Sequence, residues 1–371
     1  MTSIYSERRD QLKELLQSEG LQGALITSPA NVFYFTGFNS DPHERFMGLL
    51  LRTDGSPEIL FVPALDLSAA EEASDVQHLV AISDDELPFE KIKEAAGSLS
   101  GKLGIEGSVF SYERYQLLSK AYPQLEVQDV GALAARLRLK KSPEELDKLR
   151  TAIRLIEEVM EGAARKIRVG MTESELTAEL EFLMRKVGAD GPSFSTMVLA
   201  GEKAALPHGN PGERKFRSGD VILIDMGVVK DGYCSDITRT FVVGEASEET
   251  RKIYDIVLKS TLAGIEASRE GAVFADIDRA SRDVISEAGY GEYFNNRVGH
   301  GVGIEVHEAP SVHGRNEEQA VPGQVFTIEP GIYIPGKIGV RIEDMVFIGE
   351  DGKAEVLTSF PRELRIVGSD N

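Results

Sequence analysis

The chain has 371 residues, which is enough for two domains with a core each. Its 61 acidic and 41 basic residues give a formal net charge of −20, and this charge repels nucleic acid and anionic membranes. Its one cysteine, Cys234, excludes an intrachain disulfide. The sequence contains no run of about 18 apolar residues that could cross a bilayer. The N-terminus becomes charged at once and lacks the apolar stretch of a signal peptide. We therefore expect a soluble, cytoplasmic protein with neither nucleic acid nor a membrane as its partner.

The first 135 residues alternate helix and strand patterns. Leucines at helical spacing predict a helix from Glu7 to Glu19, and Gly20 is its expected stop. Short apolar runs predict strands at GALITS, MGLLLR, EILFV and KLGIE. We expect a small α/β domain over residues 1–135, with no nucleophile, phosphate loop or metal-ligand cluster of its own. The basic segment LRLKKSPEEL is the expected boundary to the next domain.

Residues 140–371 carry an internal repeat of two helices followed by a strand hairpin. In the first copy, helices begin at Ser142 and Thr172, each with a capping box, and the strands VILIDMGVV and YCSDITRTFVV follow. In the second copy, two helices between Ser247 and Gly289 precede the strands VFTIEPGIY and GVRIEDMVF. This pattern predicts an α+β fold whose two pseudo-symmetric helix-helix-hairpin halves share one site.

The two copies align one acidic residue with another. GDVILIDMG lies 104 positions before GQVFTIEPG, which places Asp225 on Glu329. Both acids lie in runs apolar enough to be buried, where an ionised carboxylate is costly without a compensating charge. A two-residue loop at 230–231 would set Asp225 opposite Asp236, whereas a turn centred on 231–232 would make them diagonal neighbours on one face.

The second hairpin brings a second pair of acids to the same place. A loop centred on Gly336 would set Glu329 opposite Glu343, with Arg341 on the same face. Four carboxylates this close repel one another unless a cation lies between them. Arg239 and Arg341 are the basic residues placed to pair with them, and two arginines cannot neutralise four acids. A purely structural set of acid–arginine pairs is the alternative, and it fits less well than a metal site.

His300, between glycines in VGHGVG, completes a hard ligand set, and the glycines would allow a close approach of the backbone to a ligand. Four carboxylates and one imidazole suit Mn²⁺, Co²⁺ or Fe²⁺ better than a structural Zn²⁺ site, and bridging carboxylates suit two ions rather than one. We expect two divalent ions, first of all Mn²⁺, with Co²⁺, Zn²⁺ and Fe²⁺ as alternatives. His208 in LPHGNPG and His307 in GIEVHEAP become candidates to hold a substrate carbonyl or its oxyanion.

The ordered motifs LPHG, VILIDMG, YCSDITRTF, GHGVGIEVHE, TIEPGIY and GVRIED resemble the prolidase and aminopeptidase P branch of the pita-bread peptidases, the M24 family, and the resemblance covers the whole chain. It implies a C-terminal pita-bread domain preceded by a creatinase-like N-terminal domain. It also implies that Asp225 chelates one metal ion, that His300 and Glu329 hold the other, and that Asp236 and Glu343 bridge the two.

The same resemblance assigns the catalytic and substrate-binding residues. A metal-bridging hydroxide would attack the carbonyl of an Xaa–Pro bond, with Glu329 handling the proton and His208 and His307 steadying the substrate. Arg341, in GVRIED, would point into the site. Arg315, in SVHGRN, falls where prolidases tend to place an arginine that grips the free carboxylate of the dipeptide.

The chain departs from many members of the family at Asn296, where they carry a histidine four residues before the metal-binding one. Asn can still donate a hydrogen bond, so the departure affects the polarity of the pocket rather than metal binding. In the N-terminal domain, YFTGFNSDPHERF resembles the prolidase loop that reaches across a homodimer towards the partner's active site. Asp41, His43, Glu44 and Arg45 would then form a gate over the end of the substrate, and a solvated charged loop is the alternative.

The expected activity is that of an Xaa-Pro dipeptidase acting on small peptides. The nearest alternative is an Xaa-Pro aminopeptidase, and the two differ in whether Arg315 and the loop 41–45 close the pocket beyond proline. Creatine amidinohydrolase shares the fold but works without the metal ligands, and methionine aminopeptidases lack an N-terminal domain of this kind. A catalytically inactive binding protein is a third class, disfavoured because such a protein has no physical reason to keep four buried acids.

Overall fold

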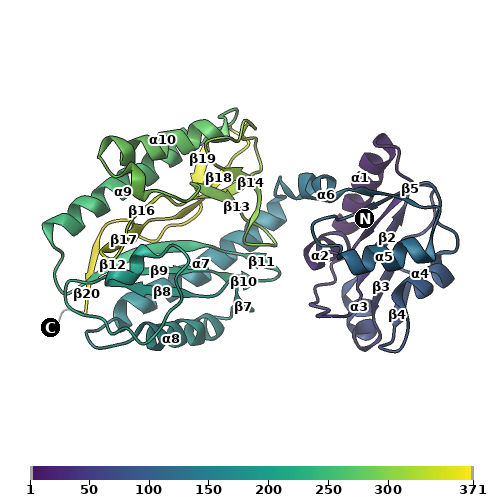
Figure 1. The fold of residues 1–371 in the computed structure, drawn as a ribbon, viewed down its shortest axis with the longest axis horizontal. Helices are drawn as coiled ribbons and strands as arrows, with labels where there is room; N and C mark the ends of the chain where they lie inside the picture. Colours follow the sequence, from purple (N-terminus) through teal and green to yellow (C-terminus); the bar gives the residue numbers. More distant parts are fainter. Residues whose placement is uncertain (1–2, 369–371) are drawn as a thin grey trace. The chain divides into compact units, whose positions relative to one another are not determined.

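The computed structural model describes residues 3–368 and separates the chain into two compact units, Met1–Arg138 and Leu139–Asn371 (Figure 1). The division lies in the gap between the predicted domains, 1–135 and 140–371. Across the described residues, no helix is both long enough and apolar enough to cross a membrane. Each unit has its own sheets and its own core, and each is described by itself.

The first unit is built on one six-stranded sheet in the order β4-β3-β2-β1-β5-β6. The sheet is mixed, because β1 pairs antiparallel with β2 and parallel with β5. Its strands are β1 (Gly23–Ile26), β2 (Gly48–Arg52), β3 (Ile59–Pro63), β4 (Leu79–Ile82), β5 (Lys102–Ile105) and β6 (Glu126–Asp129). Its helices are α1 (Ile4–Ser18), α2 (Pro29–Thr36), α3 (Leu67–Ala73), α4 (Pro88–Ala96), α5 (Tyr112–Ala121) and α6 (Gly131–Arg138), with a 3₁₀ turn η1 (Ala64–Asp66).

The α/β prediction for this unit is confirmed. The helix expected from Glu7 to Glu19 is α1, and the four expected strands are β1, β2, β3 and β5. Strands β4 and β6 were not predicted; they form the two edges of the sheet and are only partly buried. The strand β6 (EVQD) lacks the continuous apolar run that marks a strand buried on both faces, and the apolar run of β4 (LVAI) is only four residues long.

The second unit begins with the first of two similar halves. Its helices α7 (Pro143–Lys166) and α8 (Glu173–Lys186) both carry the predicted capping box. Its strands form the sheets β20-β12-β9-β8 and β11-β10-β7. Their bounds are β7 (Gly191–Pro192), β8 (Met197–Ala200), β9 (Val221–Met226), β10 (Val228–Lys230), β11 (Tyr233–Cys234), β12 (Ile237–Val243) and β20 (Arg365–Val367), with a 3₁₀ segment η2 (Gly201–Ala205).

The other half repeats the order of helix, helix and hairpin, as predicted. Helices α9 (Glu248–Ala267) and α10 (Phe274–Glu287) precede the sheet β14-β13-β15-β18-β19 and the pair β16-β17. The bounds are η3 (Gly291–Tyr293), β13 (Gly299–Gly301), β14 (Glu308–Val312), β15 (Val325–Ile328), β16 (Gly331–Ile334), β17 (Ile338–Arg341), β18 (Asp344–Ile348) and β19 (Ala354–Val356).

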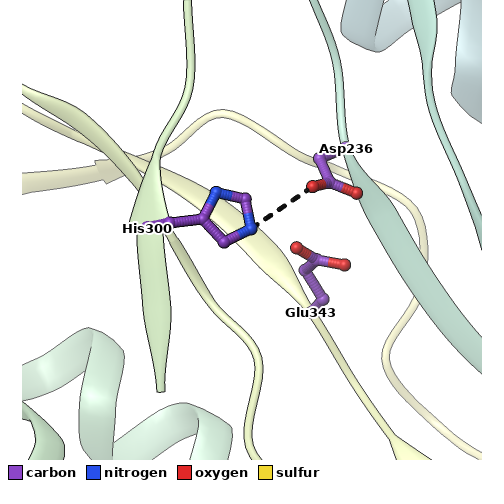
Figure 2. Close-up of side chains that lie close together, drawn as sticks. All are labelled: Asp236, His300 and Glu343. Carbon is purple, nitrogen blue, oxygen red and sulfur yellow. Dashed lines mark ion pairs between the residues drawn. The ribbon is translucent and has the colours of Figure 1, made fainter. Parts of the chain in front are cut away.

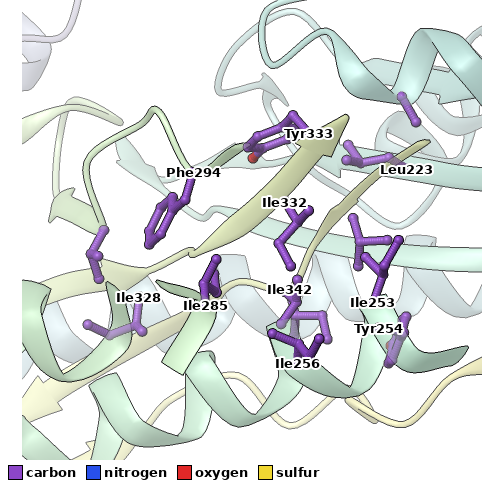
Figure 3. Packing of buried hydrophobic residues seen from close by; sticks show 14 of the residues in the cluster. Leu223, Ile253, Tyr254, Ile256, Ile285, Phe294, Ile328, Ile332, Tyr333 and Ile342 are labelled. Atoms are coloured by element: carbon purple, nitrogen blue, oxygen red, sulfur yellow. The ribbon is translucent and has the colours of Figure 1, made fainter. Parts of the chain in front are cut away.

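Two apolar cores hold the helices to the sheets. Figure 3 shows the larger one, in which Ile253 of α9, Ile285 of α10 and Ile328 of β15 are fully buried. A second core joins Ile156 of α7 to Ile224 of β9. Burying one side chain of this size contributes about 1.5–3 kcal/mol. Each helix pair therefore packs firmly against the sheet of its own half, and the strands that carry the acids are fixed from behind.

Candidate metal centre

Asp225 and Asp236 come from the first hairpin, formed by β9–β10 and β11–β12. The turn at its tip is 231–232, where both residues have a positive φ, as a two-residue hairpin loop requires. Asp225 consequently pairs with Thr238, and Asp236 lies one diagonal step away on the same face. Of the two registers that the sequence left open, the diagonal one is correct.

Glu329 and Glu343 come from the second hairpin, at the junction of its two ladders. The β15–β18 ladder and the β16–β17 ladder continue one register, and the loop at the tip is centred on Gly336, as predicted. Glu329 therefore stands across from Glu343. Outside the ladders, the Glu329 N–H donates to the Val298 oxygen at 2.7 Å, and the Glu343 N–H donates to the Thr238 oxygen at 3.2 Å. These bonds tie the acids of the second hairpin to β12 and to the start of β13.

His300 reaches the acids from β13, between Gly299 and Gly301. A Cβ atom at Gly299 would lie 1.8 Å from the Thr327 oxygen, and one at Gly301 would lie 2.1 Å from the Ala309 oxygen. The glycines are thus needed because neighbouring strands approach so closely, and the expected close approach of the backbone to a ligand stays a prediction. His300 Nδ1 lies 3.2 Å from the Gly301 oxygen. A proton on Nδ1 would donate there and leave Nε2 free to bind a metal.

Asp236, His300 and Glu343 form the centre of the site, with their side chains pointing towards one another (Figure 2). One possible ligand atom from each lies within 4.8 Å of the others, and all three residues are buried. His300 Nε2 is 3.6 Å from Asp236 Oδ2 and 3.2 Å from Glu329 Oε1. The Oδ1 atoms of Asp225 and Asp236 are buried without a hydrogen-bond partner. Leaving a buried acceptor unsatisfied costs about 1–3 kcal/mol, so these residues fit a bound cation that their oxygens would ligate.

The ionisation of the acids reflects how little positive charge lies nearby. Burial, followed by the neighbouring acids, raises the pKa of Asp236 and of Glu343 well above the ordinary carboxyl range. Burial also raises the pKa of Asp225, although a neighbouring arginine opposes it. Burial acts in the same direction on Glu329, but the hydrogen bond and charge of His300 outweigh it and lower the pKa of that carboxyl. Divalent cations would supply the missing positive charge.

One of the two arginines considered as partners for the acids lies in the site. Arg341 binds Asp225 Oδ2 at 2.5 Å and donates to the Thr238 hydroxyl at 3.0 Å. Arg239 follows Thr238 on β12, so its side chain leaves from the opposite face, and it pairs with Asp344 at 2.8 Å. The expectation that Arg239 faces the acids is therefore wrong. Among the described residues, Arg341 is the one arginine that forms an ion pair with these four carboxylates, and structural ion pairing does not account for the cluster.

A cavity of about 620 Å³ opens onto the acids, and all five predicted metal ligands are in its lining. The other predicted residues in the lining are His208, His307, Asn296 and Arg341. The rings of His300 and His307 stand edge to face with their centroids 4.1 Å apart. Burial lowers the pKa of His307 to about 4, so this ring is neutral at neutral pH and can donate a hydrogen bond without carrying charge.

Two predicted substrate-binding residues lie at the border of this cavity or outside it. Asn296 Nδ2 donates to the backbone oxygens of Arg297 at 3.0 Å and Glu329 at 3.3 Å, and its Oδ1 is buried without a partner. Arg315 lies in an adjoining hollow of about 620 Å³, which shares Asn296 and Arg297 with the cavity. The roles assigned to Asn296 and Arg315 stay predictions.

The segment 41–45, the predicted gate, belongs to the first unit. Asp41 and His43 are exposed, with His43 Nδ1 3.4 Å from Asp41 Oδ2. Arg45 pairs with Glu44 at 3.0 Å and with Asp84 at 2.8 Å. All these contacts are internal to the first unit, and the role of the segment stays a prediction.

Several residues of the cavity were not predicted from the sequence. These lining residues include Phe194, Ser195, Met197, Asn210 and Arg297. Two further residues were not predicted: Thr238, which donates to Glu343 Oε2 at 2.7 Å, and Tyr333, whose hydroxyl accepts from Arg341 at 2.8 Å. Thr238 follows Asp236 at the period of two that marks one strand face, so this residue could have been found. The loop residues carry no such periodic signal.

Comparison with known sequences defines the class of the protein. Residues 147–350 match the metallopeptidase family M24, and residues 8–140 match the creatinase/prolidase N-terminal domain. The chain belongs to metallopeptidase family M24, and the resemblance drawn from its motifs is confirmed. It is a peptidase with a creatinase-type N-terminal domain and a pita-bread domain.

Individual relatives extend over nearly the whole chain. The uncharacterized peptidase SERP1271 of Staphylococcus epidermidis is 39% identical over 352 residues, which are 95% of this chain and 99% of the relative. A prolidase from Thermococcus sibiricus has a TM-score of 0.93 at 34% identity, covering 99% of this chain and 100% of that one. An X-Pro aminopeptidase from Thermotoga maritima has a TM-score of 0.87 at 32% identity, covering 97% and 99%.

Proposed function

We propose that this peptidase is a metal-dependent Xaa-Pro dipeptidase that uses two divalent ions, with Mn²⁺ as the first candidate. The observation that carries the proposal is the buried carboxylate cluster, in which Asp225 Oδ1 and Asp236 Oδ1 have no hydrogen-bond partner and, in the described part of the chain, Arg341 is the one arginine ion-paired with the four acids. The similarity to solved prolidases supports the substrate class. The ions would be held by Asp225, Asp236, His300, Glu329 and Glu343.

Bound divalent ions lower the pKa of water and polarise a carbonyl group, which supplies a nucleophile at neutral pH. The residues of the chain then divide the remaining work. Glu329, whose pKa is lowered, is an ionised carboxylate that can take up a proton. The neutral His307 ring can donate a hydrogen bond to the substrate oxygen, and His208 at the rim of the cavity can hold the peptide. Arg341 fixes the orientation of Asp225.

The proposal is tested by stripping the protein with a chelator and assaying Leu-Pro, Gly-Pro and Leu-Pro-Pro with added Mn²⁺, Co²⁺ or Zn²⁺. We expect no activity without metal, recovery with Mn²⁺ or Co²⁺, and about two ions per chain by metal analysis. Full activity in the stripped protein would disprove metal dependence. No hydrolysis with any of the three metals would favour the third class, a catalytically inactive binding protein.

The second candidate is an Xaa-Pro aminopeptidase on longer peptides, favoured by the similarity to the aminopeptidase from Thermotoga maritima. A cation facing the dipeptide's carboxylate would favour the dipeptide, since a hydrogen bond to a charged group contributes about 1.5–3 kcal/mol. If Arg315 is that cation, Arg315→Ala lowers kcat/KM for Leu-Pro by about ten- to a hundred-fold and leaves Leu-Pro-Pro nearly unchanged. Arg297→Ala is the matched comparison, because Arg297 lines both hollows. Faster cleavage of Leu-Pro-Pro than of Leu-Pro by the wild type would promote the aminopeptidase.

We also propose a homodimer in which the segment 41–45 of one protomer reaches the partner's active site. The exposure of Asp41 and His43 supports this, because nothing in their own unit covers them. Sedimentation should give twice the mass of the chain. The variants Asp41→Ala and His43→Ala should raise KM for dipeptides while the dimer persists. A monomer with full activity would refute the proposal.

A further inference from the structure

The loop that carries His208 is fastened at its base to a buried carboxylate. Glu173, the first residue of α8, has no exposed surface. Its Oε1 accepts the N–H of Ala200 at 2.8 Å, and its Oε2 accepts the N–H of Gly212 at 3.0 Å. One side chain therefore binds the backbone at both ends of the loop 201–211.

Lys203 adds a link from within the loop. Its Nζ forms an ion pair with Glu173 Oε2 and donates to the backbone oxygen of Asn210 at 3.1 Å. The first turn of α8 contributes as well, because the Ser174 N–H donates to the Gly212 oxygen at 3.0 Å. The base of the loop is thus crossed by a small network centred on the Glu173 carboxylate.

His208 has no comparable support of its own. Its side chain is exposed at the rim of the cavity, and within residues 3–368 its ring takes part in no hydrogen bond or ion pair. The preceding segment η2 lies directly on β17, since a Cβ at Gly339 would meet the Ala204 oxygen at 1.7 Å. The place of the His208 ring therefore follows from the path of the backbone, and Glu173 fixes where that path begins and ends.

We propose that Glu173 is a positioning residue that holds His208 at the mouth of the catalytic cavity. This inference rests on the proposed function insofar as His208 touches the peptide substrate. An acid in the first turn of a helix is often simply structural, because it complements the helix dipole. Glu175 provides that comparison at the same helix end, since its Oε2 accepts the Thr172 N–H at 2.7 Å and, within residues 3–368, it forms no hydrogen bond or ion pair with the loop.

The first test needs no enzymatic activity. Glu173→Gln keeps the shape of the side chain and removes its charge, and we expect amide hydrogen exchange in 201–212 to rise about ten-fold as charge-assisted bonds become neutral ones. Glu175→Gln removes the same charge and should leave this exchange unchanged. Lys203→Met takes away one link from a partly exposed side chain and should give a smaller rise. It also replaces Glu173→Gln as the test if that variant does not fold.

The second test is a double-mutant cycle on Leu-Pro with metal-saturated protein. Glu173→Gln should lower kcat with its Mn²⁺ affinity unchanged, and combining it with His208→Ala should cost nothing beyond His208→Ala alone. Two results would overturn the proposal and make Glu173 a structural acid. One is that the kcat losses of Glu173→Gln and His208→Ala multiply in the double variant. The other is that amide hydrogen exchange in the loop of Glu173→Gln equals that of Glu175→Gln. If the wild type does not cleave Leu-Pro while the loop exchange responds as expected, the proposed function fails and the fixing of the His208 loop by Glu173 stands.

Discussion

Thr238 links the two hairpins at the acidic cluster. Its hydroxyl donates to Glu343 Oε2 at 2.7 Å and accepts from Arg341 Nε at 3.0 Å. Its backbone oxygen accepts the N–H of Glu343 at 3.2 Å. Thr238 thus orients Glu343, and Arg341 orients Asp225. Within the described part of the chain, Asp236 and Glu343 form no ion pair with a lysine or arginine, so these two acids gain most from a bound cation.

Replacing either acid by its amide tests this assignment. We expect Asp236→Asn and Glu343→Gln each to lower Mn²⁺ affinity by at least about ten-fold and to abolish most of the activity, because each removes one anionic ligand. The metal-free fold should survive, since removing a like charge relieves repulsion. Asp283→Asn, an exposed acid on α10, makes the same charge change as a control. Calorimetric Mn²⁺ titration measures the effect, and wild-type affinity in either variant would refute the role.

The raised pKa values of Asp236 and Glu343 predict how stability depends on pH. The folded, metal-free chain holds these protons more tightly than the unfolded chain. Their contribution therefore favours folding at acid pH and is lost as the pH rises from about 4 through the raised pKa values. Metal binding requires the ionised forms and strengthens over the same interval. The melting temperatures of Mn²⁺-loaded and metal-free protein should therefore diverge as the pH rises above about 4, and a constant difference would contradict the raised pKa values.

At the scale of elements, the sequence predicts what is local and misses what depends on distant partners. The hairpin tips at 231–232 and Gly336 set the registers of Asp225, Asp236, Glu329 and Glu343 from within one hairpin each. The strands β13 and β14 were missed, because β13 is three residues long, its ladder with β14 is irregular at His300/Gly301, and its pairing with β15 spans a long connection. The partners of Arg239 and Glu173 and the hollow around Arg315 are equally non-local, so periodicity could not reveal them.

Lys141 is one such non-local contact, although the sequence showed it only as part of a basic boundary. Its side chain is 1% exposed and pairs at 3.0 Å with Glu308, which is 6% exposed and directly follows His307. Removing one partner of a buried pair costs about 3–5 kcal/mol, because the other charge stays buried. Lys141→Met should therefore lower the melting temperature clearly, whereas Lys140→Met, at an exposed site, should not. Equal melting of the two variants would show that the pair contributes nothing.

At the scale of the whole molecule, the two units differ in what stabilises them. The first unit has its own apolar core, which includes Leu25, Phe61 and Ile92. The second has apolar cores of its own and, between its halves, the cluster of buried acids. A metal ion can therefore stabilise the second unit directly and has no comparable cluster to bind in the described part of the first.

Calorimetry should resolve this difference. We expect two unfolding transitions, of which Mn²⁺ raises only the one that belongs to residues 139–371. A ligand at a hundred times its Kd adds about 2.7 kcal/mol to the unit that binds it. Adding a chelator in excess should return that transition to its metal-free position. A single transition that shifts as a whole would show instead that the two units unfold together.

The position of the second pair of acids has a consequence for insertions and deletions in the chain. In the second hairpin, the ladders on both sides of Glu329 and Glu343 keep one register. Successive side chains alternate between the faces of a strand, so one residue added at this junction would turn every side chain beyond it to the other face. One residue added at the tip around Gly336 would only lengthen the loop. Related chains can therefore differ in length at the hairpin tips, while the two-residue spacing between Arg341 and Glu343 on their own arm of the hairpin has to stay constant.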